Sequence, residues 1–553
     1  MQHTQSDVLR TATMNYLAAI DPQNPPPPAQ IEFEMLEETQ SMFENENQSL
    51  TKGAKWKLPK RLTPWQVAQI LMTVCNVRKI ACAGLSGDTT YDLVCMYQED
   101  GPDKGIYVTD EDEMRRMARQ YDIGMSTREF NEMISYLRDD SQRVTMCADP
   151  DLIAVNNGIF NYRTKQLMDF TPDLVFMSKS RVDYNPNAKN VTIHNPSDNT
   201  DWDVESWMHT LSDDDEIIQL LWEILGAIIR PHVPWNKSAW FYSETGNNGK
   251  GTLCELMRQL CGDGSYAAIK LDDMGKDFAL EPLIRASAVI VDENDVGTFI
   301  DKAANLKAII TGDVIQINRK FKIPIPYRFR GFMVQCLNEM PRIKDKSDSF
   351  YRRQLFIPFE KCFTGVERKY IKDDYLHRRE VLEYVLHKVL NTDYYDLSEP
   401  EACKSALEEY KEYNDPVRQF ANEVLPECKW SLLPIGFLFD LYKKWYKRNF
   451  EKESGTSNIT FSRSIRMCLE NNPAYKVETD NEGKIKQYSP GDMMDIGEPM
   501  IDEYELKDWM NSYYAGDPDI NKRCVPVLKK QYRGIIKVNN DIQNPPDDTQ
   551  DDD

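Results

Sequence analysis

A glycine-rich loop that contains a lysine lies near the middle of the chain, between an apolar run and a helical pattern. Trp240-Phe241-Tyr242 favours a short buried strand, and Leu253–Leu260 has the spacing of a helix. Between them, residues 243–252 are Ser-Glu-Thr-Gly-Asn-Asn-Gly-Lys-Gly-Thr. Glycines let backbone N–H groups turn toward an anion, and the amino end of a helix adds a positive dipole. The pattern predicts a phosphate-binding loop.

We expect this loop to bind the phosphates of a nucleotide through Gly246, Asn247, Asn248, Gly249, Lys250, Gly251 and Thr252. Lys250 would reach the β- and γ-phosphates, and Thr252 would hold Mg²⁺. Two positions depart from the pattern GxxxxGK[ST], since Glu244 stands in place of its first glycine and Gly251 in place of its hydroxyl. A shifted hydroxyl, Lys-Gly-Thr, also occurs in adenylate-kinase-type loops. The alternative is an ordinary Gly/Asn turn between a strand and a helix.

Two carboxylates follow a second apolar run. Ala288–Val291 predicts a buried strand, and Asp292 and Glu293 come directly after it. We expect this strand to lie beside the strand that precedes the loop. Asp292 would then lie near Mg²⁺, and Glu293 would polarise the attacking water. Because many strands end in Asp-Glu, the pair has meaning only together with the loop.

A third apolar run, Phe332–Leu337, ends at Asn338, whose amide would orient the water or sense the γ-phosphate. Arg352 and Arg353 follow, before the apolar run Gln354–Pro358. A guanidinium at this place is where a ring ATPase presents an arginine finger to the ATP of the neighbouring subunit. The alternatives are a surface salt bridge for the arginines and a strand-end turn for Asn338.

Residues 237–360 resemble the superfamily 3 helicase domain of phage and plasmid primase–helicase proteins, a group similar to the poxvirus-type replicative NTPase. The resemblance is carried by the Asn-Asn-Gly-Lys-Gly-Thr loop, Val291-Asp292-Glu293, Leu337-Asn338-Glu339-Met340-Pro341 and Phe350-Tyr351-Arg352-Arg353. Further similar segments are Asn156-Asn157-Gly158-Ile159-Phe160 with Thr171-Pro172, Leu221–Gly226 and Pro434–Trp445. The similarity therefore covers roughly residues 150–490, and residues 1–145 are not recognised.

The resemblance implies an AAA+-like ring ATPase, usually hexameric, that uses ATP and Mg²⁺ and moves 3′→5′ on single-stranded DNA during phage, plasmid or mobile-element replication. Its implied partners are single-stranded or forked DNA, other copies of the chain, and a separate primase or initiator.

In this family a β-hairpin between the second and third strands points into the ring channel. The corresponding segment here contains Arg319, Lys320, Phe321 and Lys322, and bases interleaved with an aromatic suit single-stranded DNA. Leu306–Arg353 holds 11 Lys/Arg against 4 Asp/Glu. The alternative is a solvated basic hairpin.

We expect a multidomain α/β protein with an AAA+-like P-loop ATPase core, an α+β N-terminal accessory region and a C-terminal winged-helix domain. The predicted segments are 1–60 (an N-terminal segment with a proline-rich linker), 61–145 (a mixed α/β region), 146–215 (the accessory domain), 216–375 (the ATPase core), 376–428 (a helical connector), 429–490 (the winged helix) and 491–553 (an extension with an acidic disordered tail).

Local signals predict some elements within these segments. Asn156-Asn157-Gly158 between apolar runs predicts a hairpin, and Asp480–Gly483 predicts another after two helical segments. A helix over residues 217–228 would begin at the N-cap Ser212 and end before Pro231. Pro25–Pro28 predicts a stiff linker.

Two other functions compete with the replicative helicase. One is an ATP-switched initiator that binds an origin through the winged helix and does not unwind processively. The other is a small-molecule phosphotransferase, which would leave Asn338, the two arginines and the basic hairpin without a role. We predict no primase activity, because Asp149-Pro150-Asp151 is the only Asp-x-Asp pair of interest and fits a turn.

Composition limits these functions further. The chain has 553 residues, 12 cysteines without a CxxC pair and no apolar stretch that could span a membrane, so we expect a cytoplasmic protein with reduced thiols. Its net charge of -22 argues against nucleic-acid binding when taken globally. The net-basic stretch at residues 306–353 reverses that argument locally, since a ring can combine an acidic exterior with a basic bore.

Overall fold

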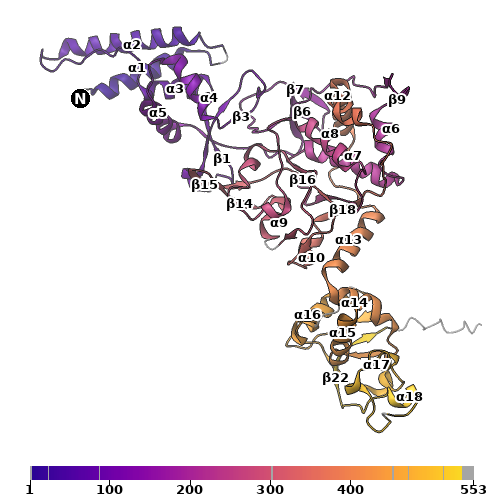
Figure 1. Ribbon diagram of the computed structural model, residues 1–553. Coiled ribbons are helices and arrows are strands. Elements are labelled where there is room, and N and C mark those ends of the chain that lie inside the picture. The colour runs from indigo at the N-terminus through magenta and orange to yellow at the C-terminus, as the bar shows by residue number, and fades with distance from the viewer. Residues whose placement is uncertain are drawn as a thin grey trace, which may run out of the picture. The chain divides into compact units, whose positions relative to one another are not determined.

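The computed structural model describes residues 3–538 apart from residues 23, 86, 301–302, 451–453, 471 and 515. The chain forms two units, residues 1–407 and 408–553 (Figure 1). Their boundary falls within the predicted connector of residues 376–428, in helix α13 (Glu401–Asn414). The predicted acidic tail, residues 541–553, lies outside the described residues. No helix in the described part of the chain has the length and apolar composition needed to cross a membrane.

The first 145 residues form one packed α/β region. Its helices are α1 (Gln5–Ala19), α2 (Pro28–Ser49), α3 (Pro64–Val74), α4 (Glu111–Tyr121) and α5 (Thr127–Asp140). Its sheet has the order β3 (Tyr107–Val108), β2 (Leu93–Tyr97), β1 (Arg78–Ala81), β4 (Arg143–Thr145), with the short helix η1 (Thr89–Tyr91) before β2.

The proline-rich stretch lies between α1 and α2, and both helices pack into the region that follows them. Pro28 is the first residue of α2, and α1 and α2 pack against each other and share a core with α3. The buried amide of Gln66 donates 3.2 Å hydrogen bonds to Thr13 on α1 and Thr39 on α2. The apolar faces of these short helices need a partner, and α3 supplies it.

The next segment begins with the predicted hairpin and leads into a long buried helix. Strands β5 (Leu152–Val155), β6 (Gly158–Asn161) and β7 (Gln166–Met168) form one sheet, and β8 (Ile193–Asn195) pairs with β9 (Thr200–Trp202). Helix α6 (Val204–His209) precedes α7 (Asp215–Ile229). The N-cap of α7 is Asp214 and not Ser212 as predicted, because the Asp214 carboxylate accepts from the Glu216 N–H, and Ser212 instead accepts from Asp214 N.

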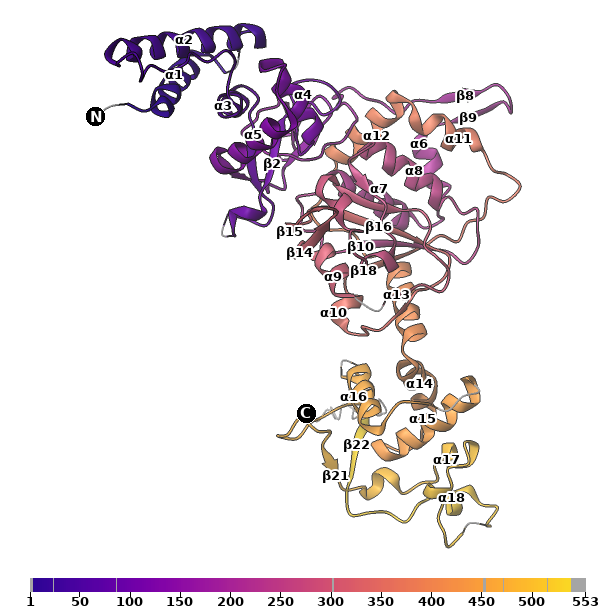
Figure 2. The same cartoon turned by 60° about the vertical axis from the view of Figure 1, so that its left-hand side comes forward.

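A five-stranded parallel sheet forms the centre of this unit. Its order is β11 (Tyr266–Ala267), β12 (Ala288–Val291), β16 (Phe332–Leu337), β10 (Ser238–Tyr242), β18 (Gln354–Pro358). In Figures 1 and 2, α7, α8 (Lys250–Cys261) and α12 (Arg379–Asn391) lie together on one side of the sheet, and α9 (Ala303–Thr311) and α10 (Asp348–Tyr351) lie on the other.

Contrary to our prediction, β12, which leads into Asp292, does not lie beside β10, the strand before the loop. Strand β16 lies between them, and its Val334 is in register with both Ala239 and Ile290. Every residue of β16 is buried, which is the pattern of a central parallel strand. Strand β11, which our sequence analysis missed, closes the edge beyond β12.

Connecting elements surround this sheet. Strands β14 (Val314–Arg319) and β15 (Lys322–Arg328) form an antiparallel hairpin, and β13 (Phe299–Ile300) pairs with β17 (Arg342–Ile343). The remaining short helices are η2 (Leu271–Asp273), η3 (Glu281–Arg285), α11 (Lys369–Asp373) and η4 (Tyr375–His377).

The second unit holds helices around a small sheet. The helices are α14 (Pro416–Val424), η5 (Leu425–Glu427), α15 (Ile435–Phe450), α16 (Asn458–Leu469), η6 (Gly491–Met494), α17 (Pro499–Glu503), η7 (Lys507–Trp509) and α18 (Ile520–Arg523). Strand β22 (Tyr532–Lys537) pairs with β19 (Leu432–Pro434), β20 (Tyr475–Lys476) and β21 (Gln487–Tyr488). The boundary predicted at residue 490 therefore does not coincide with a boundary in the structure, because a strand from beyond it lies inside the sheet.

Candidate functional site

The glycine-rich loop connects β10 to the start of α8, at the carboxyl edge of the parallel sheet. Gly249 precedes α8 with φ +87°, and a Cβ there would lie 2.6 Å from Leu211 Cδ2. Asn247 is also left-handed, at φ +55°. Its carbonyl oxygen accepts a 2.7 Å hydrogen bond from Phe363 N, and its amide donates to Glu367 Oε1 at 3.1 Å. The loop is therefore held in one shape by a segment more than 100 residues away.

Lys250 is buried at the first position of α8. Its Nζ donates to the Ser243 carbonyl oxygen at 3.3 Å and to Asn338 Oδ1 at 3.1 Å. Burial lowers the pKa of Lys250 from its ordinary value. The structure thus brings together Lys250 and Asn338, two of the residues that we selected from the sequence. These two hydrogen bonds fix the position of the amine.

The two carboxylates after β12 are exposed at the same edge of the sheet. Asp292 Oδ2 forms a 3.1 Å ion pair with Arg258 Nη2 on α8, and Arg258 also bonds Glu255. Burial raises the pKa of the Cys336 thiol well above its ordinary value. The charge of Lys250 lowers this pKa, and the charge of Asp292 raises it. Asp292 is therefore tied to the helix that begins with Lys250, although β16 separates the two strands.

Asn294 orients this acidic turn, and the sequence analysis missed it. Its buried side chain donates to Gln335 Oε1 at 2.9 Å and to the Cys336 carbonyl oxygen at 3.0 Å. Its own Oδ1 accepts from Leu271 N at 3.0 Å. Asn294 thereby ties the end of β12 to β16. The only signal in the sequence was its place directly after Asp292-Glu293.

A cavity of about 690 Å³ opens beside the loop. Its lining includes three loop and helix residues that we predicted to bind nucleotide: Asn247, Gly249 and Thr252. The other walls come from distant segments and include the aromatic side chains of Trp202, Trp207 and Phe363 and the cations Arg368, Lys369 and Lys372. A Cβ on Gly251 would lie 3.9 Å from Lys372 Nζ, so this amine lies close to the start of α8. The carboxylates Asp201, Asp203, Glu367 and Asp373 also line it, so the chamber beside the loop is aromatic and carries both kinds of charge.

Comparisons with known proteins match three parts of the chain. A family model described as D5 N terminal like covers residues 63–213, and one described as Poxvirus D5 protein-like covers residues 412–496. Residues 241–353 match a family of unknown function, DUF5906. No curated protein matches the chain. Two parts of the chain, residues 63–213 and 412–496, are thus similar to D5-like primase–helicase proteins.

Solved structures of the NrS-1 C-terminal region are also similar to this D5-like protein. The apo A form matches with a TM-score of 0.42 and 14% identity, over 86% of this chain and 100% of that chain. A second apo structure matches with a TM-score of 0.41 and 13% identity, over 86% and 99%. The D5 N terminal like match spans the boundary that we placed at residue 145, so residues 63–145 of the region that we did not recognise are also similar to D5-like proteins.

Arg352 and Arg353 of this D5-like protein lie at the opposite edge of the sheet from the loop. The Arg353 carbonyl oxygen accepts a 2.8 Å bond from Ser238 N, at the start of β10, and its guanidinium bonds Ser349. Arg352 is exposed. The five residues of β18 separate the edges by about 13 Å. The structure therefore does not bring the arginines together with Lys250 of the same chain.

The β14–β15 hairpin presents the four residues that we predicted to contact DNA, in different states. Phe321, at φ +59°, is 96% exposed, and Lys320 Nζ lies 5.4 Å from the centre of its ring. Arg319 donates to the Ile323 carbonyl oxygen, and burial lowers its pKa. Lys322 forms a 3.2 Å ion pair with Glu111 on α4. Lys320 and Phe321 are thus the most available of the four.

Proposed function

We propose that this D5-like protein is an ATP-dependent replicative DNA helicase that forms a ring and translocates 3′→5′ on single-stranded DNA. The observation that carries the proposal is the buried Lys250 amine, fixed between a loop carbonyl and Asn338, on a loop whose Asn247 and Gly249 line a 690 Å³ cavity. Burial lowers the pKa of this amine, and its charged form is stabilised when an anion replaces its neutral acceptors.

The parallel sheet supports an AAA+-like P-loop core. The strand that ends at Asn338 lies between the strand before the loop and the strand that ends at Asp292. Loop, asparagine and carboxylates therefore share the carboxyl edge, where open α/β sheets bind ligands. Gly249 and the left-handed Asn247 shape a cradle of backbone N–H groups for phosphates. The aromatic walls around Trp207 and Phe363 are suited to a nucleotide base.

The residues at this edge would have different roles in ATP hydrolysis. Lys250 would bind the β- and γ-phosphates, and Asn338 and Glu293 would orient the attacking water. Thr252 and Asp292 are the oxygen donors that suit Mg²⁺, which supplies charge neutralisation when it is bound. Arg258 holds Asp292 through one carboxylate oxygen.

The position of Arg352 and Arg353 supports assembly into an oligomer, which we propose to be a hexamer. From the far edge of the sheet these guanidiniums cannot serve the nucleotide of their own chain, and an exposed Arg352 is free to reach a neighbouring copy. In that arrangement an arginine would stabilise transition-state charge across the interface. A Lys320–Phe321 hairpin tip would contact the DNA strand, and ATP turnover would move it.

The testing experiment is a sizing measurement with ATP, combined with steady-state ATPase and unwinding assays on 3′- and 5′-tailed forks. The proposal expects an oligomer, ATPase stimulated by single-stranded DNA, and unwinding of the 3′-tailed fork. Arg352→Ala should be inactive alone, and mixing it with Lys250→Ala chains should restore part of the activity, because each supplies the half-site that the other lacks. A monomeric ATPase that DNA does not stimulate would contradict the proposal.

A basic groove in residues 408–553 favours a second candidate, an ATP-switched initiator that binds an origin through a winged helix. A cavity of about 810 Å³ is lined by α16 and the 483–485 turn. Its charged lining residues are Arg463, Arg466, Lys484, Lys529 and Arg533, and no carboxylate of the described residues lines it. Such a groove would bind duplex phosphates. Arg463→Gln should then weaken duplex binding several-fold without changing ATPase, whereas unchanged duplex binding would count against an initiator.

A further inference from the structure

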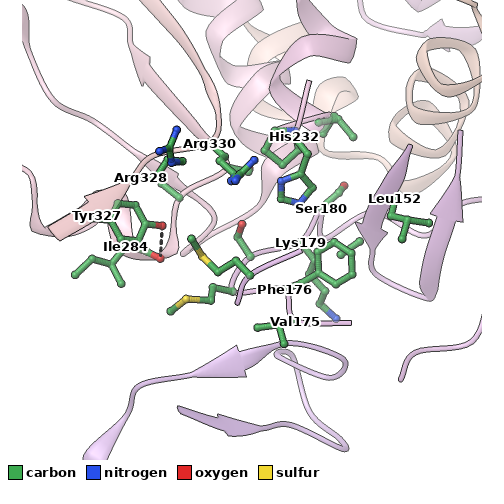
Figure 3. Close-up of a pocket in the computed structure, with 18 residues that line it drawn as sticks. Leu152, Val175, Phe176, Lys179, Ser180, His232, Ile284, Tyr327, Arg328 and Arg330 are labelled. Carbon is green, nitrogen blue, oxygen red and sulfur yellow. Dashed lines mark hydrogen bonds between the residues drawn. The ribbon is translucent and has the colours of Figure 1, made fainter. Parts of the chain in front are cut away.

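A second, smaller cavity lies within residues 1–407 and shares no lining residue with the cavity beside the loop (Figure 3). Counted as the space open to the centre of a water molecule, its volume is about 40 Å³. Its lining comes from five segments: residues 146–154, residues 175–180, the end of α7 with residues 231–232, residues 284–287, and the base of the hairpin at residues 327–330. Its lining contains Lys179, His232, Arg328 and Arg330, and no Asp or Glu from the part of the chain that the structure describes.

Arg330 has an unusual environment for a cation. Its Nε atom is buried and has no hydrogen-bond partner among the described residues. Burial, and then the like charge of Arg328, lower the pKa of Arg330. A partly buried guanidinium without a carboxylate beside it is costly, because desolvation is not offset by an opposite charge. An anion in the cavity would offset it.

His232 has unused hydrogen-bonding capacity in the same place. Both ring nitrogens are buried, and neither has a partner within the described part of the chain. The ring packs against Phe176, with centroids 5.9 Å apart, and Figure 3 shows it close to Arg330. Burial, and then the charge of Arg330, lower the pKa of His232 to about 4. A neutral imidazole here leaves one donor and one acceptor unsatisfied.

The other two cations are fixed by backbone carbonyls. Lys179 Nζ donates to the Lys104 oxygen at 2.9 Å, and burial lowers its pKa to about 8. Arg328 Nη1 donates to the Gly312 oxygen at 2.9 Å. These side chains contribute positive potential, while Arg330 and His232 retain the free donors.

We propose that this cavity binds one small tetrahedral oxyanion of the phosphate class, with Arg330 and His232 as direct ligands. A water needs about 10–15 Å³ on the same measure, so the space suits about three waters or one such anion. Four cation-forming side chains without a carboxylate favour the anion. Because Arg330 lies between β15 and β16, the bound anion would join the hairpin base to residues 175–180.

The first test observes His232 directly in the full-length protein. With six histidines in the chain, selective ¹³C-histidine labelling gives few signals, and the one absent in His232→Gln belongs to His232. Inorganic phosphate is titrated at constant ionic strength against sodium chloride. We expect phosphate, and not chloride, to shift the His232 signal and to raise its pKa from about 4 toward about 6.5.

The pH dependence gives a second readout. Lys179, Arg328, Arg330 and Tyr327 face the cavity with His232, and none is a carboxylate. In the empty cavity His232 is neutral between pH 7 and 5, and a bound anion favours its protonated form. Because phosphate itself gains a proton in this range, the pH dependence is measured with sulfate, a tetrahedral dianion whose charge stays constant there. Sulfate affinity should rise as pH falls from 7 to 5, and His232→Gln should remove this dependence.

The variants separate this site from the loop site. Arg330→Gln should weaken phosphate binding by about tenfold or more, as expected for a lost charge-assisted hydrogen bond, and Arg330→Lys should restore part of it. Lys346→Gln, which removes an exposed positive charge, is the matched control. Lys250→Ala should leave the His232 response intact, because it removes only the proposed nucleotide contact.

Two arms identify the source of the phosphate group. A response to inorganic phosphate supports a free anion, and a response only to a 5′-phosphorylated dinucleotide supports a strand terminus. No change of the His232 signal with either ligand would overturn the proposal and leave a water-filled cavity. A response abolished by Lys250→Ala and kept in Arg330→Gln would overturn it too.

Discussion

Two lysines of this D5-like protein show how differently the same side chain is used. Lys250 is buried, and burial lowers its pKa. Its amine donates to the Ser243 carbonyl oxygen and to Asn338 Oδ1. Lys320 is exposed at a hairpin tip, where its closest described partner is the ring of Phe321. The first amine has one position, and the second can adapt to its ligand.

This difference matches two kinds of recognition. Phosphoryl transfer depends on positioned charge, so a fixed amine in a desolvated site is effective. Binding of single-stranded DNA without sequence specificity depends on base stacking and on screened charge. The exposed Lys320 and Phe321 are sufficient for that. Substitutions in the two regions should therefore affect separate measurements.

Replacing the buried lysine should have the largest effect. Lys250→Ala should reduce the turnover of ATP by about 10³-fold or more, because a positioned positive charge is lost from a desolvated site. Steady-state ATPase measures this. Lys276→Ala is the control, since Lys276 only forms exposed pairs with Asp272 and Asp273 and should leave turnover unchanged. Equal loss in both variants would contradict the comparison.

The hairpin tip should affect DNA-dependent measurements alone. Phe321→Ala combined with Lys320→Ala should weaken single-stranded DNA binding by about 10- to 100-fold, because one base stack is worth about 1–3 kcal/mol. Basal ATPase should be unchanged, and its stimulation by DNA should be lost. Phe299→Ala, at an exposed phenylalanine elsewhere in the same unit, is the control. Loss of basal ATPase would show that the two regions are not separate.

The sequence predicted what depends on neighbours in the chain. The strand before the loop, the helix after it and the hairpin at residues 156–158 are local patterns, and the structure contains them. The order of the strands could not be predicted in this way, because the residues Ala288–Val291 do not indicate that they will pair with β16. The walls at Trp207 and Phe363 and the bonds of Asn294 come from distant segments, and no spacing rule brings them to the loop.

A glycine pair distinguishes loop shape from loop composition. Gly249→Ala places a Cβ 2.6 Å from Leu211 Cδ2 at φ +87°, which costs about 1–2 kcal/mol in backbone strain. We expect this strain energy to raise the KM for ATP by about tenfold. The same strain should also lower the melting temperature. Gly246→Ala is the matched control, because no atom lies within 4 Å of its Cβ position. Similar effects in both would contradict a fixed cradle.

The smallest effect should come from the ion pair that occupies Lys322. Glu111→Gln removes its 3.2 Å partner, and an exposed pair of this kind contributes at most about 1 kcal/mol to folding, so stability should barely change. The released amine should raise affinity for single-stranded DNA by about two- to threefold at low salt. The plot of log affinity against log salt should steepen by about 0.7, the value for one more phosphate contact on a single strand. Glu113→Gln, on the same helix and paired with Arg116, should leave that slope unchanged. If Glu111→Gln leaves it unchanged too, Lys322 does not lie on the path of the strand, and DNA contact is confined to the exposed tip.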